Sequence, residues 1–168
     1  ELFETAPKME EPEKISLYEA FLQRLSQYEE LESIGDAWSD MEDRLKNFYN
    51  EENYEKTHRA FMESQKENEY QYEHLMVYYT FRYFMRAFYD NNLLEKAQFA
   101  VASFLMVRDM DVMVWMENGQ KFDLSDRVET TKVYAKEVEH SEENIEMLGE
   151  SFLFEDVFSV KGLLAQIM

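Results

Sequence analysis

The first third of the chain carries hydrophobic residues at the three- and four-residue spacing of amphipathic helices. One such segment runs from Ile15 to Leu31, a second follows the Gly35–Asp36 break and reaches Phe48, and a third covers about Glu51 to Lys66. Each segment gathers its hydrophobic residues on one stripe and leaves a polar, mostly acidic back, which is typical of a helix that packs on one side. We therefore predict three amphipathic helices here.

The next two segments differ, because they are hydrophobic or aromatic on nearly every face. They span Tyr70–Asp90 and Leu93–Glu117. A helix that is apolar all round is typically surrounded by other helices. The Asp90-Asn91-Asn92 sequence between them favours a tight reversal. We predict an antiparallel hairpin over about residues 70–117 that forms the core of the domain.

The last third of the chain predicts a long helix and a short one. Asn118-Gly119 ends the preceding helix, and a new one begins near Leu124 or Ser125. A single stripe favours its continuation past His140 towards Gly149, unbroken or only kinked: Val128, Thr131, Ala135, Val138, Glu142 and Ile145. A final helix is expected over Val160–Ile167, with Ser159 as its cap.

Composition supports a helical fold throughout. The chain has only four glycines and two prolines, Pro7 and Pro12, so turn-forming residues are scarce. We predict an all-α, single-domain bundle of about six or seven helices over residues 14–168, preceded by a leader or linker over residues 1–13. The chain begins with Glu1, without an initiator Met, a signal peptide or a stretch long enough to span a bilayer. We expect an excised piece of a soluble, cytoplasmic protein.

Charge narrows the range of partners. The formal net charge is −19, and no basic stripe is present to bind phosphates, which argues against nucleic acid and anionic membranes. A cationic partner such as a lysine-bearing protein would be attracted, although acidity also serves solubility alone. The chain has no cysteine, which excludes disulfides, thiolate metal sites and a cysteine nucleophile.

Polar residues inside the two hydrophobic segments are the main candidate site. Arg82 and Arg86 lie four residues apart on one segment, and Asp109 and Asp111 lie on the other. Because buried charges rarely lack partners, one interpretation is a set of Arg–Asp pairs between the two core helices. The other is a polar pocket inside an aromatic wall. An aromatic cage for a lysine ammonium, built from Tyr78, Tyr83 and Trp115 with Asp111 as counter-charge, is a further alternative.

Two Glu-x-x-His pairs, Glu55–His58 and Glu137–His140, have the spacing found in di-iron helical bundles. Glutamate is so common in this chain that the spacing is weak support for metal, and we predict no metal site. The sequence also lacks a glycine-rich nucleotide loop, a phosphate loop and a nucleophile elbow. No catalytic residue is identified, and a self-contained enzyme is not expected.

Four segments resemble the C-terminal region of flagellin lysine N-methylase-like (FliB-like) bacterial proteins. They are EHLMVYYTFRYFMRAFYD (Glu73–Asp90), KAQFAVASFLMVRDMD (Lys96–Asp111), VYAKEVEHSEENIEML (Val133–Leu148) and EDVFSVKGLLA (Glu155–Ala165). The family's N-terminal part carries a cysteine cluster, which this chain does not contain.

The resemblance implies methyl transfer to lysines of flagellin with S-adenosylmethionine as donor, which this chain alone would not perform or bind. It suggests that the domain holds a lysine-bearing protein substrate. The candidate substrate-binding residues are Arg82, Tyr83, Arg86, Asp109 and Asp111, with Glu137 and His140 at the rim. The alternative is a non-enzymatic interaction or scaffold domain.

Overall fold

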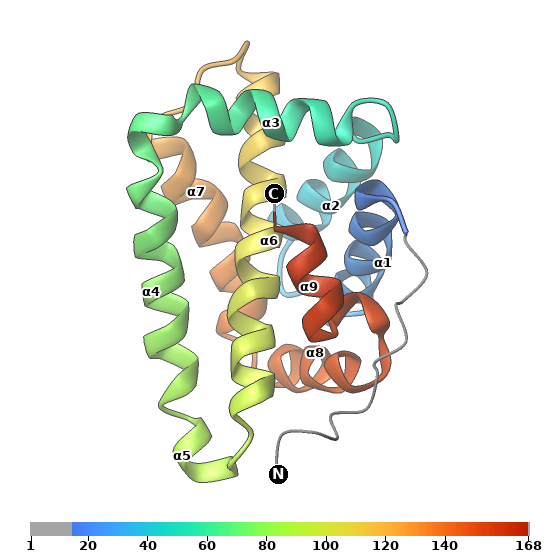
Figure 1. Ribbon diagram of the computed structural model, residues 1–168, viewed down its shortest axis with the longest axis vertical. Helices are drawn as coiled ribbons and strands as arrows, with labels where there is room; N and C mark the ends of the chain where they lie inside the picture. Colours follow the sequence, from blue (N-terminus) through green and yellow to red (C-terminus); the bar gives the residue numbers. More distant parts are fainter. Residues whose placement is uncertain (1–14, 168) are drawn as a thin grey trace, which may run out of the picture.

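The computed structural model describes residues 15–167, except for the side chain of Asp90. Over this range the protein is all-α. No strand occurs in this range. The helices are α1 (Leu17–Glu29), α2 (Asp36–Phe48), α3 (Tyr54–Ser64), α4 (Tyr70–Phe84), α5 (Ala87–Asp90), α6 (Leu93–Glu117), α7 (Leu124–Tyr134), α8 (Glu142–Phe154) and α9 (Val160–Gln166) (Figure 1). The predicted fold class is confirmed. The predicted leader over residues 1–13, with Pro7 and Pro12, lies outside the described residues.

Helix α6 is the centre of the bundle. It packs against α2, α3, α4, α7, α8 and α9, and in Figure 1 it runs along the long axis of the molecule beside α4. Its side chains from Phe99 to Met113 are almost all buried, as the all-round hydrophobic pattern predicts. Nevertheless, no helix within residues 15–167 is long and apolar enough to cross a membrane.

The reversal between α4 and α6 follows the local chemistry of the two asparagines. Asn91 adopts the left-handed conformation, with φ of 56°, and Asn92 caps α6 by accepting a hydrogen bond from the backbone NH of Glu95. Helix α4 ends at Phe84, so the last turn of the segment predicted as one helix over Tyr70–Asp90 forms the separate helix α5. Helices α4 and α6 then pack along each other.

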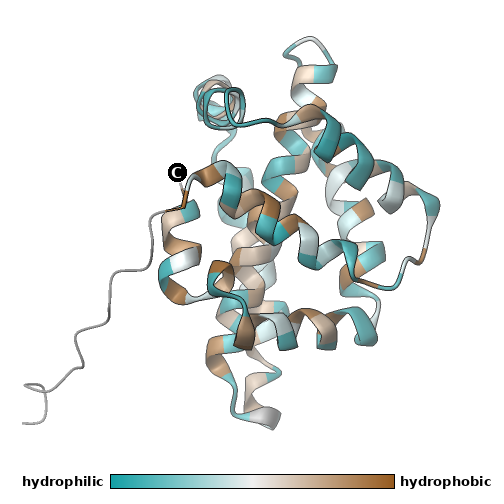
Figure 2. Cartoon of the chain, turned by 90° about the vertical axis from the view of Figure 1, so that its right-hand side faces the viewer, coloured by the Kyte–Doolittle hydropathy of each residue, from teal (hydrophilic) through white to brown (hydrophobic). Residues whose placement is uncertain are grey.

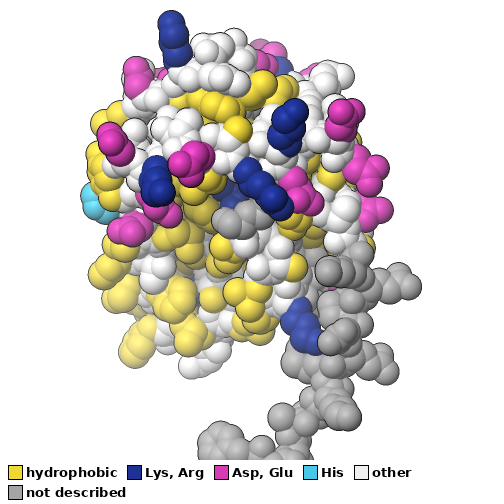
Figure 3. Space-filling model, turned by 45° about the horizontal axis from the view of Figure 1, so that its top comes forward, with side chains coloured by type: hydrophobic (Ala, Val, Ile, Leu, Met, Phe, Trp, Pro, Cys, Tyr) yellow, Lys and Arg dark blue, Asp and Glu magenta, His cyan; other side chains and the backbone are white. Residues whose placement is uncertain are grey.

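Helix α4 is not surrounded by other helices, and the prediction of burial on all sides was wrong for it. Its buried residues, Tyr72, Leu75, Tyr79 and Tyr83, form a single stripe. The opposite side, continued by α5, leaves large hydrophobic side chains exposed, and we call it the apolar outer face: Val77, Phe81, Met85, Phe88 and Tyr89. Figure 3 shows hydrophobic side chains gathered on the lower left, the side on which α4 lies in Figure 1. Hydrophobicity alone did not distinguish the covered side from the bare one.

The helix is interrupted between α7 and α8, so the predicted continuation of one helix through Ser141 was also wrong. The end of α7 passes into a π-helical segment, Ala135–Glu139, in which the NH of His140 donates to the carbonyl of Ala135 at 3.1 Å. Ser141 is extended and caps α8 by accepting from the NH of Asn144. The proposed stripe misled because Val128 is exposed, whereas α7 buries Arg127, Thr130 and Tyr134.

Helices α1 and α2 are amphipathic and bury their hydrophobic sides, and Figure 2 shows hydrophilic and hydrophobic residues alternating along the helices. Phe21, Leu25 and Tyr28 of α1 are buried, as are Trp38 and Leu45 of α2. Ser159 caps α9 by accepting from the NH of Gly162, as predicted. This first turn packs tightly on the preceding segment, because a Cβ at Gly162 would lie 2.3 Å from the carbonyl oxygen of Asp156.

We expect Gly162→Ala to destabilise the fold by at least about 1–3 kcal/mol, since the new methyl group overlaps backbone atoms that cannot move aside cheaply. Gly149→Ala is the matched control. Its Cβ would meet Glu95 at an ordinary 3.5 Å, and alanine in a helix interior gains roughly 0.5–1 kcal/mol over glycine. Urea unfolding of both variants checks this; equal stability of the two would contradict the packing described for α9.

Candidate functional site

The two aspartates of α6 are buried in two separate clusters. Asp109 is completely buried and pairs with Arg24 of α1. Its carboxylate also accepts from the hydroxyl of Tyr54 at 2.8 Å, and its backbone carbonyl accepts from the hydroxyl of Tyr49 at 2.7 Å. Burial alone would raise the pKa of Asp109, but the positive charges of Arg24 and His58 and the hydrogen bond from His58 outweigh it and lower the pKa to about 2.

His58 of α3 completes this cluster through both ring nitrogens. Its Nδ1 lies 2.8 Å from the carbonyl oxygen of Tyr54, and its Nε2 lies 2.9 Å from Oδ1 of Asp109. The imidazole ring therefore connects the backbone of α3 to the Asp109 carboxylate, which Arg24 contacts from α1.

Asp111 forms the second cluster, on a different side of α6. Its carboxylate accepts from the hydroxyls of Tyr72 and Thr130, and Nε of Arg127 lies 3.4 Å from Oδ2. Burial is the largest influence on this carboxyl group and outweighs these partners, raising the pKa of Asp111 to about 6. The cluster joins α6 to α4 and α7.

The π-helical segment supplies a third charged group, Glu139, whose side chain is fully buried against α4. The hydroxyl of Tyr78 donates to Oε2 at 2.8 Å, and Nε of Arg82 lies 2.9 Å from the same oxygen. The other oxygen, Oε1, has no hydrogen-bond donor among the described residues. Burial, and secondly the hydrogen bond to Glu139, raises the pKa of Tyr78 to about 12, so this hydroxyl stays protonated at neutral pH.

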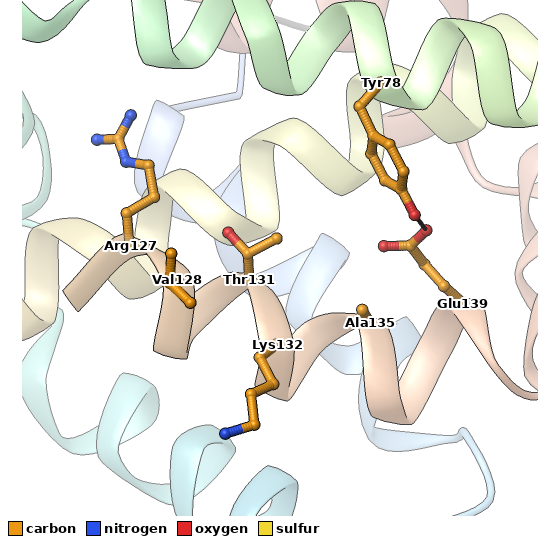
Figure 4. A pocket seen from close by; sticks show the side chains of 7 residues that line it. All are labelled: Tyr78, Arg127, Val128, Thr131, Lys132, Ala135 and Glu139. Atoms are coloured by element: carbon orange, nitrogen blue, oxygen red, sulfur yellow. Dashed lines mark hydrogen bonds between the residues drawn. The ribbon is translucent and has the colours of Figure 1, made fainter. Parts of the chain in front are cut away.

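A groove runs between α4 and α7 and connects the second and third clusters. It consists of two adjoining cavities of about 290 and 470 Å³ that share Tyr78, Arg127 and Thr131 in their linings. Figure 4 shows Tyr78 descending from α4 towards Glu139, while Thr131 and the Arg127 guanidinium point from α7 towards α4. The remaining lining residues are mostly apolar or aromatic: Tyr70, Gln71, His74, Leu75, Leu124, Val128, Lys132 and Ala135. We call this the α4–α7 groove, and it is the candidate functional site.

The predicted site residues do not assemble into one polar centre. Asp109 and Asp111 are paired, as expected of buried charges, but their partners are Arg24 and Arg127, and the predicted Arg–Asp pairs between α4 and α6 are wrong. Arg82 pairs with Glu139. The reason is that α6 turns different sides to α1, α4 and α7, and aspartates two residues apart face different neighbours.

The other predicted residues are dispersed. Tyr83 is buried beside Phe99, with ring centroids 4.3 Å apart, whereas Arg86 and His140 are exposed. Glu137 is buried and accepts from the backbone NH of Ile34. Of the seven residues predicted to bind substrate, Arg82 and Asp111 contact charged residues that line the groove, namely Glu139 and Arg127. Whether any of them contacts a substrate stays a prediction.

The two alternative sites are not formed. Trp115 packs against Phe61 and Tyr83 against Phe99, so the aromatic cage is not assembled. Among residues 15–167 no three histidine or carboxylate side chains are grouped to hold a metal ion. In each Glu-x-x-His pair one member is buried and the other faces outward, since His58 and Glu137 are covered while His140 is exposed and the Glu55 side chain is 46% exposed.

Sequence reasoning missed Arg127 and Glu139, the two buried charged residues of the groove. A signal for Arg127 existed, because Arg127, Thr130 and Tyr134 have the sequence spacing of one helical face, and the structure buries that face. No comparable signal existed for Glu139, since its position depends on the π-helical turn that contains it. π-Helical turns are rare and often occur at functional sites, which supports the choice of this groove.

The described part of the chain is thus an all-α domain with an interhelical groove between α4 and α7. Comparison with protein-family models assigns it to the C-terminal domains of lysine N-methylases. The chain belongs to the family described as FliB lysine N-methylase C-terminal domain, whose model matches residues 1–166. No curated protein and no solved structure matches the chain. The resemblance stated from four segments between Glu73 and Ala165 is thereby confirmed and extends over nearly the whole sequence.

We expect Asp109→Asn to destabilise the fold by about 3–5 kcal/mol, because Arg24 would be left buried without the carboxylate that balances its charge. Asp40→Asn is the matched control, because the Asp40 side chain is 68% exposed and pairs with Arg44 at the surface. Urea unfolding of both variants measures the difference. Equal stability of the two would contradict the charge arrangement described around Asp109.

Proposed function

We propose that the domain holds a lysine-bearing segment of a protein substrate, flagellin by the family's kinship, in the α4–α7 groove. The methyl group is transferred by the rest of the lysine N-methylase. The observation that carries the proposal is Oε1 of Glu139, a buried carboxylate oxygen at the groove floor that has no donor among the described residues. An unsatisfied buried acceptor is costly, and a lysine ammonium supplies the missing hydrogen bond together with a compensating charge.

The groove suits the whole lysine side chain. The ring of Tyr78, the methyl group of Thr131, Val128 and Ala135 offer apolar surface for the four-carbon stem. At the end of this surface, Tyr78 and Arg82 fix the Glu139 carboxylate through Oε2 and leave Oε1 for the ligand. The residues therefore position a lysine and are not assigned a part in the chemical step.

Long-range charge favours the same kind of partner. With a formal net charge of −19, the domain attracts cationic segments before contact and raises their rate of encounter. S-adenosylmethionine, the donor expected from the family resemblance, is proposed to be bound by the remainder of the enzyme. The fragment would then be inactive by itself.

A scaffold role is the second candidate, and the apolar outer face of α4 and α5 favours it. Phe81 is 72% exposed and Phe88 is 84% exposed, and clustered exposed hydrophobic side chains often mark a protein interface. On this hypothesis the Arg82–Glu139 pair only joins α4 to the π-helical segment. Arg82→Ala would then lower stability while leaving substrate binding and methyl transfer unchanged.

We expect Glu139→Gln in the complete enzyme to lower kcat/KM for flagellin by about tenfold or more, mainly through KM, because a charge-assisted hydrogen bond is lost. The measurement is transfer of a labelled methyl group to flagellin. Glu129→Gln is the matched control: it makes the same change nearby on α7, at a side chain that is 65% exposed and does not line the groove.

Ala135→Leu provides a second variant that fills the groove without altering any charge, and it should also raise KM. It guards against the possibility that Glu139→Gln merely unfolds the α4–α7 junction, which circular dichroism would reveal. Normal kinetics in a folded Glu139→Gln enzyme and in Ala135→Leu would refute substrate holding by this groove and favour the scaffold role.

Binding of flagellin to the domain is expected to weaken as salt is added. The screening length falls from about 10 Å at 0.1 M to about 3 Å at 1 M ionic strength, so attraction between the acidic surface and a cationic segment fades. Association rates measured at several sodium chloride concentrations test this. Rates that do not depend on ionic strength would remove electrostatic steering from the proposal.

A further inference from the structure

Arg127 stands in the α4–α7 groove away from Glu139, and its guanidinium has fewer partners than its burial demands. The side chain is 6% exposed. Its Nε lies near Asp111 without hydrogen-bond alignment, and Nη1 and Nη2 are buried without an acceptor among the described residues. Buried guanidinium groups normally give their hydrogens to carboxylates or carbonyls. The fork of Nη1 and Nη2 thus marks a position that an acceptor is suited to fill.

Neighbouring groups hold the guanidinium plane and balance its charge. Its carbon lies 3.8 Å from the centre of the Tyr72 ring and 5.4 Å from that of Phe122, distances at which a cation is attracted to an aromatic face. Asp111 supplies one negative charge, and its carboxylate is fixed by the hydroxyls of Tyr72 and Thr130. The charge of Arg127 is therefore nearly balanced before any ligand binds.

We propose that this part of the groove binds the carboxylate group of a ligand with an apolar or aromatic body. A carboxylate matches the guanidinium fork with two parallel hydrogen bonds. A single negative charge fits better than a phosphate dianion, because Asp111 already balances Arg127. The side chains beside it, Tyr70, Leu75, Tyr78 and Leu124, provide the surface for the ligand body in the cavity of about 470 Å³.

Access requires a small movement of Arg127 itself. Its Nη atoms are covered, although the residue lines both cavities. Rotation about the terminal bonds of this long side chain turns the fork into the larger cavity while Nε stays beside Asp111. The proposal does not depend on lysine holding at Glu139, since the two groups contact different atoms of a ligand.

The test uses phenylacetate as probe, with neutral phenylacetamide as its matched partner, and follows the Arg127 Nε–H signal by NMR in the 168-residue chain. We expect phenylacetate to shift this signal with a dissociation constant of the order of 1 mM, and phenylacetamide to bind at least about tenfold more weakly. Arg127→Lys, which keeps the charge but loses the fork, should weaken phenylacetate binding. Lys132→Gln, the other cation lining the groove, should not.

A second pair of probes identifies the source of the carboxylate. The blocked dipeptides N-acetyl-Phe-Glu-amide and N-acetyl-Phe-Gln-amide differ only in a side-chain charge; preference for the first over phenylacetate indicates an acidic protein segment, and the reverse indicates a free acid. Equal binding of phenylacetate and phenylacetamide, or loss of binding in Lys132→Gln alone, would overturn the proposal. So would an unperturbed Arg127 signal in the unmodified protein, a result that needs no variant to fold.

Discussion

One buried carboxylate, that of Asp109, constrains how the helices of this domain come together. Its partners arrive from α1 through Arg24, from α3 through Tyr54 and His58, and from the residue just after α2, Tyr49. Arg24 also donates to the side chain of Gln166 at the end of α9, whose backbone carbonyl accepts from Arg108. A buried charge is tolerable only while its partners stay in place, because removal of one costs about 3–5 kcal/mol. The carboxylate on α6 therefore ties helices from both ends of the described chain to the centre.

The features that depend on neighbouring residues along the chain were predicted correctly from the sequence. The Asn91-Asn92 reversal, the Ser159 cap and the buried α6 each depend on local conformational preference or on a hydrophobic run long enough to be decisive. The all-α fold class was predictable because glycine and proline are scarce in the sequence.

Features set by packing between distant segments were not predictable in the same way. The sequence identifies Asp109 and Asp111 as charges that need partners, but it does not say that α1 and α7 supply them. It gives α4 a hydrophobic surface all round without stating which side is covered. The end of α7 was misjudged because the side chain of Asn144 holds the break between α7 and α8 in place. It hydrogen-bonds to the backbone NH and carbonyl of Glu32, which is far away in sequence, and to the carbonyl of Glu137.

The π-helical segment at the floor of the groove has an evolutionary consequence. A π-turn is equivalent to one residue inserted into an α-helix, and each residue turns a helix by about 100°. Loss of a single codon between Ala135 and Glu139 would restore a regular helix and change the direction in which Glu139 projects towards α4, while the residues on either side keep their present neighbours. Among relatives of this domain, a one-residue gap at this place would therefore signal a changed groove even where every other residue of its lining is identical.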